Sequence, residues 1–269
     1  HVRCARWDER LIVSGITFLA GISPPSLICV SFRSPSGQTP LAPLRSGPPP
    51  QAGHTGSVSA PTQADLVEAV RADGIRDERV LEAFGAVPRA EFVPFELIEH
   101  AYVDIPLPIP HDQVTTQPSL VARMVEALDL SGSERVLEIG TGYGFQTALL
   151  ARLADFVWSV ERWPDLAANA REHLARHGVR NAEVVVGDGS EGLPEQAPFE
   201  AVLVSAAFPR VPLPLADQVA EGGRLVQPIG RGGMEEVVLF EHGPRGLDAR
   251  RVLTGAHFVR LYGKHGFAQ

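Results

Sequence analysis

The sequence predicts an α/β fold with a Rossmann-like, doubly wound and mostly parallel sheet. Short runs rich in Val, Ile and Leu alternate along the chain with longer segments whose apolar residues recur at helical spacing. The short runs are apolar almost throughout, which is typical of parallel strands buried on both faces. The alternation of the two patterns indicates helices that cover such a sheet.

The first elements form an N-terminal helical extension over residues 62–118. Residues 64–74, 77–87 and 89–98 have apolar positions at helical spacing, which predicts three short helices. Residues 101–118 contain several prolines, and a residue before proline avoids the α conformation. We therefore expect an extended segment between these helices and the main domain.

The main domain is expected over residues 119–269. Its helices are predicted at 119–130, 145–154, 165–178 and 214–222. Its parallel strands are predicted at 135–140, 156–161, 182–188, 199–206 and 223–229. Two later segments, 235–242 and 250–263, predict an antiparallel hairpin-type addition at the C-terminal end of the sheet.

Residues 1–61 have a different composition. Much of this segment is rich in Pro, Gly and Ser, which predicts a disordered tail. The chain begins with His1, so we interpret the tail as a start-site artefact or leftover sequence, with a secretory signal as the alternative.

Charge and cysteine content limit the function classes. The net charge is −8; residues 1–61 carry five Arg against Asp8 and Glu9, so the remainder is −11. A domain this acidic argues against nucleic-acid substrates. The two cysteines, Cys4 and Cys29, both precede the main domain. We expect a cytoplasmic monomer that binds no membrane and contains no cysteine-based metal site.

The turn after the first strand of the main domain carries three glycines, in "EIGTGYGF". A dinucleotide fingerprint needs its third glycine one residue later, where Phe145 stands, and a P-loop needs a Lys that this turn lacks. Three consecutive predicted strands of the main domain each have an acidic residue at their end, and these are Glu138, Glu161 and Asp188. Glu138 suits a cation, Glu161 suits ribose hydroxyls and Asp188 suits an adenine amino group. Together they favour S-adenosylmethionine, although each acid alone is more typical of a helix cap.

The segments "VLEIGTGYG", "VWSVE", "VVVGDGS" and "VLVSAAFPRVPLPL" resemble protein-L-isoaspartate O-methyltransferases, which are class I S-adenosylmethionine-dependent methyltransferases. The resemblance extends to "VPRAEFVP", "AYVDIPLPIPHDQVTTQPSLVA", "GRLVQPIG" and "FVRLYGKHGF", and covers about residues 64–267. It implies methyl transfer to the α-carboxylate of isoaspartyl residues in damaged proteins or peptides. The ester then closes to a succinimide, whose hydrolysis restores some aspartyl linkage.

The resemblance also implies site residues. Thr116 aligns with a family Ser whose hydroxyl holds the acceptor carboxylate, and Asp112 replaces a family Gly just upstream. We expect Thr116 to be catalytic. We expect the following residues to bind the cofactor: Thr115, Glu138, Gly140, Gly142, Gly144, Glu161, Asp188 and Gly189. The two departures leave open a related enzyme that methylates aspartate in a dedicated peptide or a small molecule.

Other interpretations fit the residues less well. A non-catalytic adenosylmethionine-binding module is disfavoured by the retained hydroxyl, and a nicotinamide dehydrogenase by the glycine spacing. His173 and His177 have i, i+4 spacing, but no third ligand pattern accompanies them, so no metal site is expected.

Overall fold

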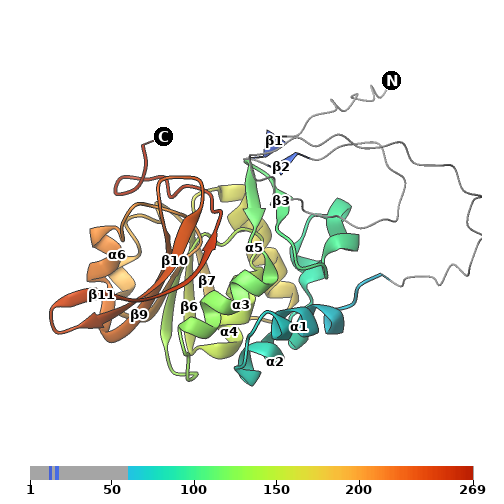
Figure 1. Cartoon of the computed structure of the whole chain (residues 1–269), viewed down its shortest axis with the longest axis horizontal. Helices are drawn as coiled ribbons and strands as arrows, with labels where there is room; N and C mark the ends of the chain where they lie inside the picture. The colour runs from blue at the N-terminus through green and yellow to red at the C-terminus, as the bar shows by residue number, and fades with distance from the viewer. Residues whose placement is uncertain (1–11, 14–15, 18–59, 269) are drawn as a thin grey trace, which may run out of the picture. The chain divides into compact units, whose positions relative to one another are not determined.

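The structure is a computed structural model that describes residues 12–13, 16–17 and 60–268 (Figure 1). The chain divides into two units, residues 1–55 and 56–269. In the first unit, β1 (Ile12–Val13) pairs antiparallel with β2 (Ile16–Thr17). Nearly all of the tail predicted over residues 1–61 lies outside the described residues.

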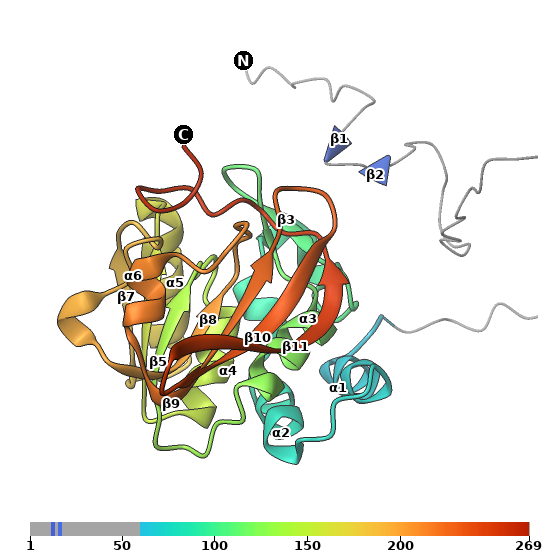
Figure 2. The same ribbon diagram turned by 60° about the vertical axis from the view of Figure 1, so that its left-hand side comes forward.

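The second unit is built on a seven-stranded sheet in the order β11-β10-β9-β8-β5-β6-β7. Its strands are β5 (Arg135–Ile139), β6 (Phe156–Glu161), β7 (Ala182–Val186), β8 (Phe199–Val204), β9 (Val219–Ile229), β10 (Glu235–Gly243) and β11 (Gly246–Ala256). The strands from β9 to β7 run parallel, whereas β10 pairs antiparallel with both β9 and β11 (Figure 2). The predicted α/β class and its antiparallel C-terminal addition are therefore confirmed.

The strand order determines where a ligand can enter. The chain moves outward from β5 to β6 and β7, and then returns to place β8 on the opposite side of β5. The carboxyl ends of β5 and β8 consequently diverge at a topological switch point, where open α/β sheets bind their ligands.

Two apolar clusters bury the two faces of this sheet. Alternate residues of one strand point to opposite faces, so Val136 belongs to one cluster and Leu137 to the other. The first cluster also contains residues of α3 (Pro118–Ala127), α4 (Phe145–Leu153) and α5 (Pro164–Arg176). The second contains Leu215 of the short helix α6 (Leu213–Asp217). The sheet is thus covered on both faces, with most of the helical cover on one.

The N-terminal extension packs against the first of these clusters. Helices α1 (Gln63–Ala72) and α2 (Glu78–Ala86) contact α3 and α4 (Figure 1). The segment 89–98, predicted as one helix, instead forms the 3₁₀ helices η1 (Arg89–Phe92) and η2 (Phe95–His100). Pro94 separates them, because proline lacks the N–H that a continuous helix requires.

The extended segment 101–118 contains the hairpin of β3 (Leu107–Ile109) and β4 (Gln113–Thr115). Its turn residues His111 and Asp112 have φ values of 64° and 55°. Asp is among the few residues other than Gly that adopt this left-handed conformation, because its short polar side chain can form a local hydrogen bond. This explains how Asp112 can stand where the resemblance implies Gly.

The helix predicted over 214–222 is wrong in its second half. Helix α6 ends at Asp217, and Val219 already pairs with Phe199 as the first residue of β9. Gly222 has a φ of 76°, which a helix excludes. Strand pairing with β8 therefore overrides the local helical pattern. Within the described residues, no helix combines the length and apolar character that crossing a membrane requires.

Candidate active site

A cavity of about 920 Å³, measured with its open mouth, lies at the switch point between β5 and β8. Six of the nine predicted site residues line it: Thr115, Thr116, Gly140, Gly142, Glu161 and Gly189. Glu138, Gly144 and Asp188 do not, and neither does Asp112.

The glycine turn forms the floor of the cavity. Gly140 and Gly142 have φ values of 96° and 55°, a region in which residues with a side chain are rarely found. Gly189 approaches from β7, where a Cβ atom would lie 2.4 Å from Ile139 Cγ2. The bare backbone at these positions therefore allows a ligand to approach closely.

Glu161 is fixed by two backbone donors. Its Oε2 accepts from the N–H of Gly142 at 2.9 Å, and its Oε1 accepts from the N–H of Trp163 at 3.0 Å. Its side chain lines the cavity at the end of β6. Each carboxylate oxygen retains a lone pair, so the group can accept two neighbouring hydroxyls of a ligand.

Glu138 lies beneath the glycine turn rather than in the cavity. It is fully buried and accepts from Gln146 Nε2 at 2.7 Å, Thr147 Oγ1 at 2.5 Å and Ser159 Oγ at 2.5 Å. Burial raises the pKa of Glu138 to about 7, although these three hydrogen bonds lower it. Ser159 also bonds Thr141 of the glycine turn at 2.5 Å. Glu138 thus supports the turn from behind.

Gln146 lines the cavity, whereas Glu138, which the sequence suggested for contact with a cationic ligand, does not. Its Nε2 donates to Glu138 and, at 3.0 Å, to Ser205 Oγ, which orients the amide. Its Oε1 is buried and has no partner among the described residues, while the side chain lines the cavity. An unpartnered buried acceptor is costly, so this oxygen is suited to a ligand donor. Both Gln146 and Ser205 were missed because neither type marks a site in a sequence.

Asp188 binds the C-terminal segment. Its Oδ2 accepts from the N–H of Lys264 at 2.7 Å, and its Oδ1 accepts from Ser190 Oγ at 2.7 Å. Although partial burial opposes them, these bonds hold the pKa of Asp188 below its usual value. The N–H of His265 in turn donates to Ser190 Oγ at 2.9 Å. Asp188 therefore anchors residues 263–265 beside the cavity.

Arg162 and Tyr262 line the cavity and interact with each other. The Arg162 guanidinium lies 4.9 Å from the ring centroid of Trp163 and 5.2 Å from that of Tyr262. The His111 ring stacks on Trp163 with centroids 4.0 Å apart, and His111 Nε2 lies 2.8 Å from Asp165 Oδ2. The hairpin β3–β4 is thereby attached to the start of α5.

The segment that carries Thr116 is held on both sides, by Arg89 at Thr115 and by Asp104 at Gln117. Arg89, which is buried, donates to the carbonyl oxygens of Ala101, Val103 and Ile105, and also to Thr115 Oγ1 at 3.0 Å. Burial lowers the pKa of Arg89 to about 10, so it remains charged at neutral pH. The hydroxyl of Thr115 is therefore used within the protein.

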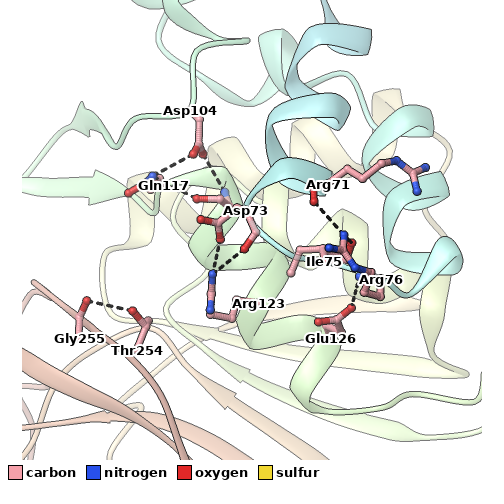
Figure 3. Close-up of polar contacts among 11 residues, drawn as sticks. Arg71, Asp73, Ile75, Arg76, Asp104, Gln117, Arg123, Glu126, Thr254 and Gly255 are labelled. Atoms are coloured by element: carbon pink, nitrogen blue, oxygen red, sulfur yellow. Dashed lines mark hydrogen bonds and ion pairs between the residues drawn. The ribbon is translucent and has the colours of Figure 1, made fainter.

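Asp104 fixes the other neighbour of Thr116. Its carboxylate accepts from Gln117 Nε2 at 2.9 Å (Figure 3). It also accepts from the N–H of Ser119, at the start of α3, at 2.8 Å. Thr116 lies between these two restrained residues and lines the cavity. Within the described part of the chain, its hydroxyl bonds no protein group. It is thus available to a ligand.

The histidines with i, i+4 spacing have other partners. His173 Nδ1 lies 3.0 Å from the carbonyl oxygen of Tyr143, and the ring of His177 stacks on Phe92. Among the residues that the structure describes, no group of three His, Cys, Asp or Glu side chains could hold a metal ion.

The sequence of this chain matches one family of known proteins. The family model of protein-L-isoaspartate(D-aspartate) O-methyltransferases matches residues 61–266. Protein-L-isoaspartate O-methyltransferase 1 of Syntrophobacter fumaroxidans is 50% identical over 194 residues, which are 72% of this chain and 90% of that protein. Protein-L-isoaspartate O-methyltransferase of Anaeromyxobacter dehalogenans strain 2CP-1 is 52% identical over 190 residues, which are 70% of this chain and 91% of that protein.

Two solved structures described as protein-L-isoaspartate O-methyltransferases superpose on this chain. A protein-L-isoaspartate O-methyltransferase with 29% identity superposes with a TM-score of 0.67, over 76% of this chain and 67% of that one. A Plasmodium falciparum protein described as the same enzyme was solved with S-adenosyl-L-homocysteine. It is 24% identical, with a TM-score of 0.63 over 74% of this chain and 97% of its own, and supports the fold alone.

Proposed function

The chain belongs to the protein-L-isoaspartate(D-aspartate) O-methyltransferase family, and on this premise we propose how its residues serve methylation of isoaspartyl α-carboxylates. Enzymes of this family are S-adenosylmethionine-dependent protein carboxyl methyltransferases. The observation that carries the proposal is the hydroxyl of Thr116, which has no partner among residues 60–268 and shares a cavity with the glycine turn and Glu161.

The residues present fit the cofactor. Glu161 would accept from the ribose hydroxyls, because both of its oxygens are oriented by backbone N–H groups and retain free lone pairs. The unpartnered Gln146 Oε1 would accept from the ammonium group. The glycine backbone at 140 and 142 leaves room for the amino-acid portion. When bound, the cofactor supplies an electrophilic methyl group.

Thr116 would donate a hydrogen bond to one oxygen of the acceptor carboxylate. Since Arg89 restrains Thr115 and Asp104 restrains Gln117, the backbone that carries Thr116 is held on both sides beside the cavity. A neutral donor orients the carboxylate without neutralising it, so its lone pair stays nucleophilic. Positioning of this kind supplies a large part of the rate.

The site needs no general base. A carboxylate with an ordinary pKa of about 3–4 is already ionised at neutral pH. This agrees with a cavity in which Glu161, held by two backbone donors, is the only lining carboxylate among the described residues. Glu138, with its pKa near 7, is sealed from the cavity and serves the glycine turn.

We also propose that the protein acts as a cytoplasmic monomer without nucleic-acid or membrane partners. The net charge of −8 and the absence of cysteine after residue 29 support this proposal.

One experiment tests the proposed function directly. Isoaspartyl and aspartyl versions of the same peptide are offered with methyl-labelled S-adenosylmethionine. We expect label in the isoaspartyl peptide only, as a base-labile ester. Label in neither peptide, or mainly in the aspartyl one, would favour the enzyme with a dedicated substrate.

A second experiment tests the cofactor site, by calorimetry of S-adenosylhomocysteine binding to the Glu161→Ala variant. We expect a loss of about 1–3 kcal/mol of binding free energy.

A further inference from the structure

One wall of the cavity carries a cation without an acidic partner. Arg260 lines the cavity with an exposed side chain. Within residues 60–268, no carboxylate lies at ion-pair distance from its guanidinium. This wall is distinct from the glycine turn and Glu161, which are assigned above to the cofactor.

The backbone determines the direction of this side chain. The N–H of Leu261 donates to the carbonyl oxygen of Ala207 at 2.8 Å, and the N–H of Ala207 donates to that of Val259 at 2.8 Å. Val259 and Leu261 pack into the second apolar cluster. Because alternate residues of an extended segment point in opposite directions, Arg260 is turned away from that cluster.

Aromatic rings hold two arginines in this region. The Arg260 guanidinium lies 5.1 Å from the ring centroid of Phe267, and the Arg210 guanidinium lies 5.8 Å from that of Phe208. The two rings meet edge to face at 5.1 Å. Such cation–π contacts orient a guanidinium but leave its N–H donors free. We call Arg210 and Arg260 the arginine rim.

The nearby acid Glu235 does not form an ion pair with the arginine rim. Glu235 is buried, and its Oε2 accepts from the N–H of Phe258 at 3.1 Å. It is at ion-pair distance from neither arginine, and Arg210 has no carboxylate partner within the described residues. In a chain with a net charge of −8, the rim is therefore a local positive region beside the cavity.

We propose that the arginine rim selects isoaspartyl polypeptides that carry a second carboxylate next to the reacting residue. The proposal rests on the proposed function, since the reacting carboxylate enters the cavity that Arg260 lines. Guanidinium groups bind carboxylates through charge-assisted and often bidentate hydrogen bonds. Because the rim is exposed, solvent screens it, and the preference is a factor of about two to five rather than an absolute requirement.

The test uses isoaspartyl peptides that differ only at the residues flanking the isoaspartate, which are Glu, Gln or Lys. For each peptide, kcat/KM is measured at low and high salt, and binding is measured with the enzyme saturated with S-adenosylhomocysteine. The variants are Arg260→Gln, Arg260→Lys, Arg210→Gln and the double Gln variant. Arg251→Gln is the matched control, because Arg251 is an exposed arginine of β11 outside the cavity lining.

In the wild type we expect kcat/KM for the Glu peptide to exceed that for the Gln peptide about two- to fivefold, with the Lys peptide lowest. High salt should reduce the difference. Arg260→Gln should bring the Glu/Gln ratio close to one, Arg260→Lys should retain part of it, and Arg251→Gln should leave it unchanged.

Equal values for the three peptides in the wild type, or an unchanged ratio in the double variant, would overturn the proposal. The binding measurement separates this outcome from failure of the proposed function. Charge-dependent peptide binding that is lost in Arg260→Gln, without any methyl transfer, would support the rim and contradict the function.

Discussion

At the scale of single residues, Thr116 decides whether the acceptor carboxylate is held as proposed. Thr116→Val keeps the shape of the side chain and removes only its hydroxyl. We expect kcat/KM on an isoaspartyl peptide to fall about ten- to a hundredfold, which corresponds to about 1.4–2.7 kcal/mol of transition-state interaction. The affinity for S-adenosylhomocysteine, measured by calorimetry, should remain nearly constant.

Thr116→Ser is the matched variant, since it retains the donor and should keep substantial activity. Thr115→Val has a different expected effect. The Thr115 hydroxyl accepts from Arg89 and from the N–H of Leu107, so its loss should lower the melting temperature. Unchanged turnover in Thr116→Val would require another residue to orient the carboxylate.

Glu138 makes stability depend on pH. Its pKa in the folded protein is about 7, against an ordinary value of 4.5, so between these pH values the folded state binds a proton that the unfolded state has released. Stability contributed by this proton is present below pH 4.5 and is lost as the pH rises to about 7. The loss is on the order of 3 kcal/mol.

Glu138→Gln should lack this loss, because Gln stays neutral at every pH. Urea unfolding at pH 4.5 and pH 8 measures the effect. The free energy of unfolding should fall more steeply with pH in the wild type than in the variant. Glu183→Gln on the exposed edge of β7 is the control and should behave as the wild type does. Identical pH slopes in wild type and Glu138→Gln would mean that Glu138 stays ionised in the folded protein.

At the scale of elements, the β3–β4 hairpin is attached to α5 through His111. The hairpin contributes Ile109 and Gln113 to the cavity lining, and the stack of His111 on Trp163 holds its tip. A stacked aromatic pair contributes about 0.5–1.5 kcal/mol beyond its buried area. His111→Ala should therefore weaken binding of S-adenosylhomocysteine about two- to tenfold.

The same variant should show faster amide hydrogen exchange over residues 107–115, because the hairpin tip has lost its contact with α5. His100→Ala, at the exposed end of η2, is the control and should change neither quantity. Wild-type exchange and affinity in His111→Ala would show that β-pairing alone holds the hairpin over the cavity.

At the scale of the whole molecule, we predict from their composition that residues 1–58 contribute nothing to folding or catalysis. Among the described residues, the buried members of the apolar clusters begin at Leu66. A chain that begins at Ser59 should therefore have the melting temperature and turnover of the full chain. Calorimetric scans and peptide methylation by both proteins measure this. A lower melting temperature or turnover in the shorter chain would mean that the missing residues contribute to the domain.

The sequence by itself determined the features that depend on local pattern. The alternation of apolar runs and helical spacing predicted β5 to β9 and the helices between them, apart from the second half of the segment 214–222. The spacing of Gly140 and Gly142, with an acid at the end of the next strand, predicted three residues that line the cavity. These features were accessible because backbone conformation and strand burial follow from neighbouring residues.

Only the tertiary structure decided which partner each polar side chain has. Asp188 bonds Lys264, which is 76 residues further along the chain, and Gln117 is held by Asp104. Arg260 lines the cavity because its segment pairs with Ala207, although its sequence carries no sign of a site. Hydrogen bonds and burial are set by whichever segments the fold brings within about 3 Å, and that proximity has no counterpart in local sequence.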